Sequence, residues 1–212
     1  MTTLLIVRHG YSRTNKEKRF TGQMDVPLDE IGRRQAEELG RYVMGRFTVD
    51  TVYASDLTRA YDTVKPIADA IHLPIRTDAA LREVDVGEWQ GMLFEEVADH
   101  YPESFAIYKR KPGLTRFDGG ESFAELLERA ASAIGRIARE NEGKTVVIGT
   151  HGGVIRALHA LWTGISLERM EELPQVPNAS LTVAECEGGT VTLREVGYCD
   201  FLTDRTAETG VR

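Results

Sequence analysis

Short apolar runs recur along the chain and predict β-strands. Four of them occupy residues 4–7, 51–54, 145–149 and 181–184, and each is bounded by polar residues or glycine. A fifth segment, 191–196, follows a pair of glycines and is expected to form an antiparallel hairpin with the fourth.

Longer segments between these runs show apolar positions at helical spacing. The clearest cover residues 31–43, 60–71 and 126–137. Ser122 and Glu125 stand at capping-box spacing just before the third segment, which marks the start of that helix. Strands that alternate with helices predict an α/β fold of three layers. A mostly parallel central sheet would lie between helices on both faces and end in an antiparallel edge hairpin.

Residues 88–120 fit this alternation poorly. The segment contains Pro102, Pro112, aromatic pairs and a cluster of basic residues at 109–111 and 116. No repeat, low-complexity tract or linker-like stretch divides the chain. We therefore expect a single domain over residues 1–212, with 88–120 as an insertion or lid over the active end of the sheet.

The composition and charge narrow the class of partner. The chain of 212 residues is 42% hydrophobic and carries a formal net charge of −7, which argues against nucleic acid or an anionic membrane as the main partner. A phosphate site in such a protein must gather its positive charge locally. Cys186 and Cys199 lack the spacing of a metal or redox pair. The N-terminal apolar run has only four residues and no basic segment before it, so we expect a cytoplasmic protein.

Two His-Gly pairs each follow a strand-like run. His9 and Gly10 follow the first strand and Arg8, while His151 and Gly152 follow the third long run. Ligands of open parallel sheets bind beyond the carboxyl ends of the strands, so the two histidines are expected to meet there. The glycine after each histidine lets a backbone amide approach an anion closely.

A basic residue and an acidic loop are further candidates. Ser55 or Asp56 could cap the helix after the second strand and place Arg59 in its first turn, where an arginine can bind phosphate. The alternative is a surface arginine paired with Asp62. An acidic loop follows, in which a carboxyl group near Trp89 could act as a general acid or could simply be solvated. Residue chemistry alone leaves three choices open there: Glu83, Asp85 and Glu88.

These segments together resemble the histidine phosphatase superfamily, in its phosphoglycerate-mutase-like branch. Five separated motifs in the family's order carry the resemblance over nearly the whole chain. They are Arg8-His9-Gly10 with Asn15 and the following Thr21-Gly22, Asp25, Leu28, Gly32 and Gln35-Ala36; Ser55-Asp56-Leu57 with Arg59-Ala60 and Thr63; Leu81, Glu83, Gly87, Trp89 and Gly91; Gly120-Glu121-Ser122; and His151-Gly152. Two departures, Tyr11 where the family usually has Glu and Thr14 where it often has an aromatic residue, concern the pocket entrance.

The resemblance implies a role for each matched residue. His9 would be the nucleophile and form a phosphohistidine, with its other ring nitrogen bound to a backbone carbonyl. The resemblance also selects Glu83 as the acid that protonates the leaving alcohol. The groups around the transferring phosphoryl would be Arg8, Arg59 and His151, with further hydrogen bonds from Asn15, Thr21, Gly22 and Gly152. No metal or other cofactor is implied, and His72, His100 and His159 are expected in surface or packing roles.

Hydrolysis of small phosphate monoesters is the leading expectation, and a cofactor-dependent phosphoglycerate mutase with the same nucleophile is the alternative. Mutases of the family look longer and use arginines of an insertion to clamp the substrate carboxylate, whereas this chain is short. The basic cluster at 109–111 keeps a carboxylated substrate open. A third hypothesis is a phosphate-binding protein without activity, which the retention of all five catalytic positions disfavours.

Overall fold

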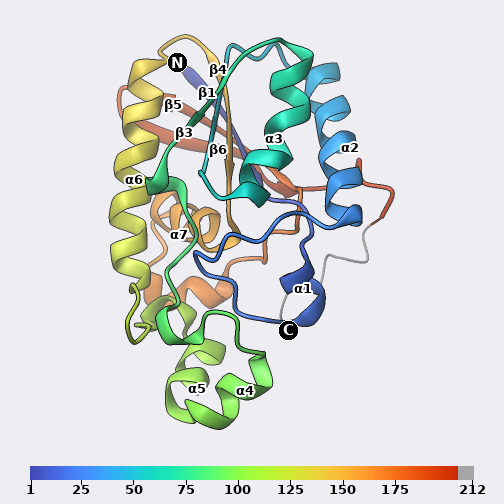
Figure 1. Cartoon of the computed structure of the whole chain (residues 1–212). Coiled ribbons are helices and arrows are strands. Elements are labelled where there is room, and N and C mark those ends of the chain that lie inside the picture. Colours follow the sequence, from blue (N-terminus) through green and yellow to red (C-terminus); the bar gives the residue numbers. More distant parts are fainter. Residues whose placement is uncertain (205–212) are drawn as a thin grey trace.

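A six-stranded mixed sheet forms the centre of the structure, a computed structural model that describes residues 1–204 (Figure 1). The strand order is β3-β2-β4-β1-β5-β6. The four strands from β3 to β1 are parallel, and β5 runs antiparallel to both β1 and β6. The expected fold class is thereby confirmed. The strands are β1 (Thr2–Arg8), β2 (Thr51–Ala54), β3 (Ile75–Thr77), β4 (Thr145–Thr150), β5 (Leu181–Glu187) and β6 (Thr190–Tyr198).

Helices cover both faces of this sheet. Leu4 and Ile6 of β1 face a core shared with α6 and α7, whereas Leu5 and Val7 face the core shared with α2 and α3. This alternation follows from the two-residue period of a strand. The helices within residues 1–204 are α1 (Arg13–Glu17), α2 (Glu30–Arg46), α3 (Thr58–Ala70), α4 (Phe94–His100), α5 (Pro102–Arg110), α6 (Phe123–Glu140) and α7 (Gly152–Thr163). Short 3-10 turns are η1 (Ala79–Leu81), η2 (Gly87–Trp89), η3 (Pro112–Leu114) and η4 (Leu167–Glu172).

The predicted strands and helices are all present, and the cap of α6 is the one expected. Ser122 Oγ accepts a hydrogen bond from the Glu125 N–H, which completes the capping box. The predicted cap of α3 is wrong: Leu57 is its N-cap residue, without a side-chain hydrogen bond. Ser55 Oγ instead accepts from the Leu57 N–H, and the Asp56 carboxylate is bound by Arg82.

Besides α4 and α5 in the 88–120 segment, one strand and two α-helices within residues 1–204 were not predicted from the sequence. The edge strand β3 has three residues and no buried one, and α1 has five residues, so neither is long enough to show a period. Helix α7 is apolar on most of its surface, and a helix without a polar face lacks a clear amphipathic signal. No helix within residues 1–204 is long and apolar enough to cross a lipid bilayer.

Residues 88–120 lie beyond the carboxyl ends of β1 and β4, where Figure 1 shows α4 and α5 below the sheet. Aromatic rings attach this segment to the loop that follows α1: the Phe20 ring lies 4.5 Å from that of Phe94 and 5.2 Å from that of Tyr108, measured between centroids. An ion pair of 2.6 Å joins Lys111 Nζ to Glu171 Oε1 in η4. The segment therefore lies over the end of the sheet at which both His-Gly pairs emerge.

Candidate active site

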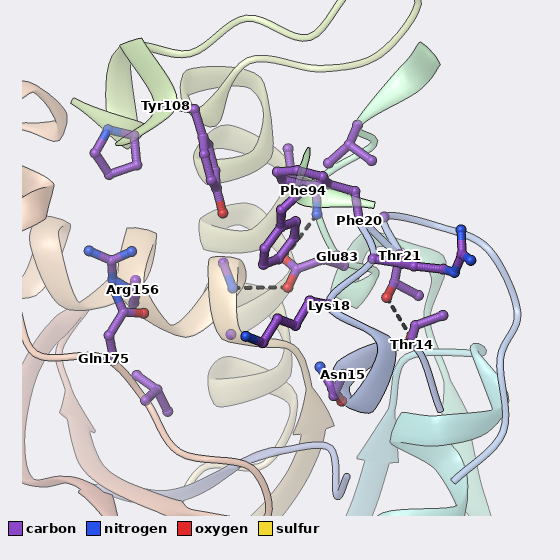
Figure 2. A pocket seen from close by; sticks show the side chains of 18 of the residues that line it. Thr14, Asn15, Lys18, Phe20, Thr21, Glu83, Phe94, Tyr108, Arg156 and Gln175 are labelled. Atoms are coloured by element: carbon purple, nitrogen blue, oxygen red, sulfur yellow. Dashed lines mark hydrogen bonds between the residues drawn. The ribbon is translucent and has the colours of Figure 1, made fainter. Parts of the chain in front are cut away.

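A pocket of about 410 Å³ opens at the carboxyl ends of β1 and β4, between the sheet and the 88–120 segment (Figure 2). Six Lys and Arg side chains line it, against the carboxylates of Glu83 and Glu171. This is the local concentration of positive charge that a phosphate site requires in a chain of net charge −7. His9 lies among the lining residues at the base of the pocket.

The two histidines meet, as the sequence predicts. Strands β1 and β4 are parallel neighbours with Arg8 opposite Thr150, so the residues after them emerge side by side. The centroids of the His9 and His151 rings are 5.2 Å apart. His9 is 5% exposed and His151 is fully buried, so both rings sit in a medium that disfavours charge.

His9 is held as a neutral imidazole with a defined orientation. Its Nδ1 lies 2.8 Å from the Gly10 carbonyl oxygen, which can only accept, so Nδ1 carries the proton and Nε2 keeps its lone pair. Burial, reinforced by the positive charges of Arg59 and Arg8, lowers the pKa of His9 well below 6.5. The ring therefore has the form that a nitrogen nucleophile needs at neutral pH.

His151 is neutral for similar reasons. Its Nε2 lies 2.9 Å from Ser55 Oγ, while its Nδ1 is buried without a hydrogen bond to residues 1–204. Burial, followed by the charges of Arg59 and His9, lowers the pKa of His151 well below 6.5. An unpartnered buried nitrogen is costly in a folded protein, and such groups are typical of sites that bind a ligand.

The two predicted arginines, Arg59 buried and Arg8 half-buried, have part of their donors engaged by backbone carbonyls. Arg8 Nη1 donates to the Val176 carbonyl, and Arg59 donates to those of Gly22 and Met24, each at 2.7 Å. The Nε atom of each arginine has no partner among residues 1–204. Burial lowers the pKa of Arg59 to about 10, so it stays charged at neutral pH. The alternative pairing of Arg59 with Asp62 is wrong, because its bonds go to the backbone.

Arg8 lines the pocket, whereas Arg59 and His151 lie buried next to it. His151 packs against His9, and the charge of Arg59 acts on both rings. The base of the pocket therefore has an outer layer, formed by Arg8 and His9, and an inner layer that determines the charge state of the outer one.

Geometry separates the three acidic candidates. Only Glu83 lines the pocket. The carboxylate of Asp85 accepts from the Gly87 N–H at 2.9 Å, and that of Glu88 accepts from the Tyr101 hydroxyl at 2.9 Å, both outside the pocket. The loop therefore presents one carboxylate to the site.

The Glu83 carboxylate is oriented by backbone donors on two elements. Its Oε1 accepts from the Val84 N–H and its Oε2 from the N–H of Gly153 in the first turn of α7, both at 3.0 Å. A methyl group at Gly153 would lie 2.3 Å from Oε1, so only glycine leaves room for this contact. Gly153 was not singled out by sequence reasoning, and the second glycine after His151 was the available signal.

The remaining predicted binding residues also line the pocket: Asn15, Thr21, Gly22 and Gly152. Asn15 Oδ1 accepts from the Ser12 N–H at the start of α1, and Thr21 donates its hydroxyl to Thr14 Oγ1 at 2.7 Å. A methyl group at Gly152 would lie 3.2 Å from Arg8 Nε, so this glycine lets the guanidinium lie against α7.

Three further lining residues were not predicted. Lys18 follows α1, Tyr108 belongs to α5, and Arg156 lies one helical turn after Gly152 on α7. Figure 2 shows the Tyr108 hydroxyl pointing into the pocket, with Arg156 on one side and Glu83 on the other. Only Arg156 left a sequence signal, its spacing of four from Gly152. Within residues 1–204 no group of three or more His, Cys, Asp or Glu residues is placed to hold a metal ion.

A neutral histidine beside two arginines and a carboxyl group, at the carboxyl edge of a mostly parallel sheet, defines an α/β enzyme that handles phosphate groups. Residues 4–198 match the model of the histidine phosphatase superfamily, branch 1, and the chain belongs to this superfamily. The resemblance drawn from the motifs is thereby confirmed, and with it the expectation of a histidine-type phosphatase.

Relatives with assigned names include both enzymatic classes. Phosphoserine phosphatase 1 of Hydrogenobacter thermophilus is 34% identical over 187 residues, or 88% of each chain. The 2,3-bisphosphoglycerate-dependent phosphoglycerate mutase 2 of Gloeobacter violaceus is 38% identical over 208 residues, which cover 95% of this chain and 94% of that one. The solved structure of Bacillus stearothermophilus YhfR superposes with a TM-score of 0.91 at 32% identity, covering 95% of this chain and 99% of that one.

Proposed function

We propose that the protein hydrolyses small phosphate monoesters in two steps through a phosphoryl group carried on His9. The observation that supports this most directly is the state of His9: a neutral ring whose Nδ1–H is bound to the Gly10 carbonyl, so that Nε2 keeps its lone pair. In the first step Nε2 forms a bond to phosphorus while the ester P–O bond breaks. The electron pair of that bond leaves with the alcohol oxygen.

Glu83 is the proposed proton donor to the departing oxygen. In the second step the same carboxylate takes a proton from the water that attacks the phosphohistidine, and phosphate leaves. Arg8, Arg59 and His151 would stabilise the negative charge of the transferring group, with Asn15 as a further donor. Removing one such donor from an enzyme typically costs about 10²–10³ in kcat.

The same proposal includes a substrate class, since the far end of the pocket carries further donors. Arg156 is half-buried; its Nη2 donates to the Met170 carbonyl, while its Nε is buried without a partner among residues 1–204. The Tyr108 hydroxyl and Lys18 face the same space. Glu171 also lines it, but Lys111 compensates its charge at 2.6 Å. These donors suit an alcohol that bears a carboxylate, and relatives include a phosphoserine phosphatase.

Mutase activity is the second candidate, supported by the relative of that name in Gloeobacter violaceus. That relative aligns over 94% of its length, so chain length does not separate the two activities as the sequence analysis supposed. The basic cluster at 109–111, which left a carboxylated substrate open, has Lys111 engaged by Glu171 and Arg110 Nε donating to the Ala106 carbonyl.

The remaining elements of the proposal concern context. Residues 1–212 would act as a single domain, of which the last eight residues lie outside the described part, and 88–120 would form a lid over the pocket. The acidic net charge favours a free small-molecule substrate over nucleic acid or a membrane. The proposed location is the cytoplasm.

The test is phosphate release from a panel of monoesters in the presence of EDTA, together with a coupled mutase assay. The panel contains phosphoserine, 3-phosphoglycerate and an aryl phosphate. We expect release that survives EDTA, that disappears in His9→Ala, and that is accompanied by an acid-labile phosphoenzyme in the wild type. Mutase flux with negligible release would instead identify the second candidate. If neither assay detects activity, both activities are contradicted and a binding protein is favoured.

A further inference from the structure

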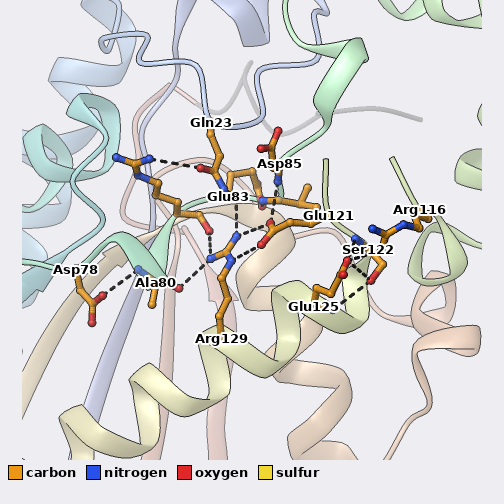
Figure 3. Close-up of polar contacts among 12 residues, drawn as sticks. Gln23, Asp78, Ala80, Glu83, Asp85, Arg116, Glu121, Ser122, Glu125 and Arg129 are labelled. Atoms are coloured by element: carbon orange, nitrogen blue, oxygen red, sulfur yellow. Dashed lines mark hydrogen bonds and ion pairs between the residues drawn. The ribbon is translucent and has the colours of Figure 1, made fainter. Parts of the chain in front are cut away.

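The loop that carries Glu83 has no regular structure of its own between η1 and η2, yet it is held by one side chain of α6. Arg129 donates to the carbonyls of Ala80 at 2.9 Å, Arg82 at 2.8 Å and Glu83 at 2.9 Å (Figure 3). These bonds come from Nη1 and Nη2. A backbone segment without helix or strand structure is therefore tied to α6.

The other donors of Arg129 bind Glu121. Nε donates to Glu121 Oε1 at 2.6 Å and Nη2 to Oε2 at 2.8 Å. A guanidinium has five N–H groups, and these contacts together employ five acceptors, three of them carbonyls of the acid loop. No other side chain has this number of donors in a fixed plane, so the position requires arginine rather than lysine.

Glu121 holds the loop at a point that follows Glu83 in the sequence. Its Oε2 accepts from the Asp85 N–H at 2.9 Å, and its own N–H donates to the Asp85 carbonyl at 2.8 Å. Burial alone would raise the pKa of Glu121, but the bonds from Arg129 and the Asp85 N–H prevail and lower it. The loop is therefore fixed by a charged pair both before and after the residue that enters the pocket.

We propose that Arg129 and Glu121 are positioning residues, which set the place of the Glu83 carboxyl group relative to the leaving oxygen. The proposal rests on the proposed role of Glu83 as general acid. Gln23 assists, since its Nε2 also donates to the Glu83 carbonyl, at 3.2 Å. Because the backbone is fixed on both sides of Glu83, the Glu83 carboxylate lies within the pocket and accepts a hydrogen bond from the Gly153 N–H. Rates of proton transfer depend steeply on such placement, so a substitution in the pair should slow the step that Glu83 assists.

The experiment is a double-mutant cycle between Arg129→Lys and Glu83→Gln, with Glu121→Gln as a second, milder substitution. For each variant kcat/KM is measured with an aryl phosphate, whose leaving group needs little protonation, and with an alkyl phosphate, whose leaving group needs much. Arg139→Gln, on the same helix but exposed, is the matched control. Thermal denaturation reports the stability of every variant.

We expect Arg129→Lys to lower kcat/KM for the alkyl phosphate about 10- to 100-fold and for the aryl phosphate less than about threefold. In the Glu83→Gln background the same substitution should cost almost nothing more, because the group that it positions is gone. Equal losses with both substrates, or losses that add in the double variant, would show a merely structural role and overturn the inference. If Glu83→Gln alone leaves alkyl hydrolysis intact, the acid assignment fails and the inference with it, while phosphate release that depends on His9 would still support the proposed phosphatase.

Discussion

The two ends of the pocket are built differently. At the phosphate end, His9, His151 and Arg59 are 5% exposed or less and lie at the ends of central strands or in the first turn of a helix. At the leaving-group end, Lys18 ends the five-residue helix α1 with a φ of 55°, and Tyr108 stands on α5, a helix with no fully buried residue. The phosphate end is therefore held in place by the central sheet, whereas the leaving-group end is formed by short elements.

This contrast fits the different tasks that we propose for the two ends. The phosphoryl group is common to all substrates, so its binding groups can be fixed once and buried deeply. The alcohol differs between substrates, and the segments that meet it are the kind that tolerate change without loss of the core. The 88–120 segment and Lys18 are connected, since the Lys18 carbonyl accepts from the Phe94 N–H at 3.0 Å. Chemistry and selectivity should therefore respond to separate substitutions.

The largest difference in activity is expected between two substitutions in the acid loop, Glu83→Gln and Asp85→Asn. Glu83 enters the pocket, while the Asp85 carboxylate only closes a turn with the Gly87 N–H. We expect Glu83→Gln to lower kcat for an alkyl phosphate by about 10²–10⁴, the usual contribution of a general acid. Asp85→Asn should cost less than about tenfold, because the amide oxygen can still accept the turn hydrogen bond. Steady-state kinetics of the two variants test this prediction. A larger loss in Asp85→Asn than in Glu83→Gln would contradict the role of Glu83 as the general acid.

The next largest effect is expected from Gly153→Ala, which tests whether the α7 contact orients the acid. The added methyl group would fall 2.3 Å from Glu83 Oε1, so the carboxylate has to move. We expect kcat/KM for an alkyl phosphate to fall about 10- to 100-fold, as for other displacements of about 1 Å at a reacting group.

The stability of Gly153→Ala should be unchanged or slightly raised, because alanine favours a helix over glycine by about 1 kcal/mol. The control is Gly135→Ala on α6, where the only near neighbour of a new methyl group is the flexible end of Arg139, at 3.4 Å. A Gly153→Ala variant with wild-type kinetics would show that the contact is incidental.

The same contrast explains how much of the molecule could be predicted from sequence. The phosphate end follows from local patterns, because a strand that ends in His-Gly fixes where His9 and His151 emerge. The leaving-group end depends on contacts between distant segments. Tyr108 reaches the pocket only because α5 folds back over it, and Arg129 reaches the acid loop across 46 positions of sequence. Ser55 or Asp56 was expected to cap α3 from its position alone, but the Ser55 hydroxyl contacts His151 Nε2. These contacts are determined by tertiary packing, and the local propensities of the sequence carry no information about it.

A pH titration of stability tests the buried, neutral state of the phosphate end. Burial and Arg59 lower the pKa of both His9 and His151 well below 6.5, so just below pH 6.5 the unfolded chain binds more protons than the folded one. The stability that the neutral rings contribute is therefore complete above pH 6.5 and is lost as the pH falls below it. Each histidine should contribute a slope of up to about 1.4 kcal/mol per pH unit there, a tenfold change in the folding equilibrium.

The measurement is urea denaturation between pH 7.5 and 5, comparing the wild type with His9→Gln and with His100→Gln. His100 is exposed in the last turn of α4 and serves as the control. Removal of His9 should flatten the dependence of unfolding free energy on pH, and His100→Gln should follow the wild type. Identical slopes in all three proteins would mean that His9 is not held neutral by the fold.

The smallest effect is expected at the leaving-group end, in the choice between 3-phosphoglycerate and glycerol 3-phosphate. These esters differ only by a carboxylate in place of a hydroxymethyl group, so their ratio of kcat/KM isolates that charge. We expect the wild type to favour 3-phosphoglycerate about tenfold, the value of one charge-assisted hydrogen bond. Lys18→Gln should reduce this ratio about threefold or more, whereas Lys144→Gln, exposed and outside the pocket, should leave it unchanged. A wild-type ratio near one would remove the carboxylate preference but leave His9-dependent hydrolysis untouched, because the groups that bind the phosphoryl lie at the other end of the pocket.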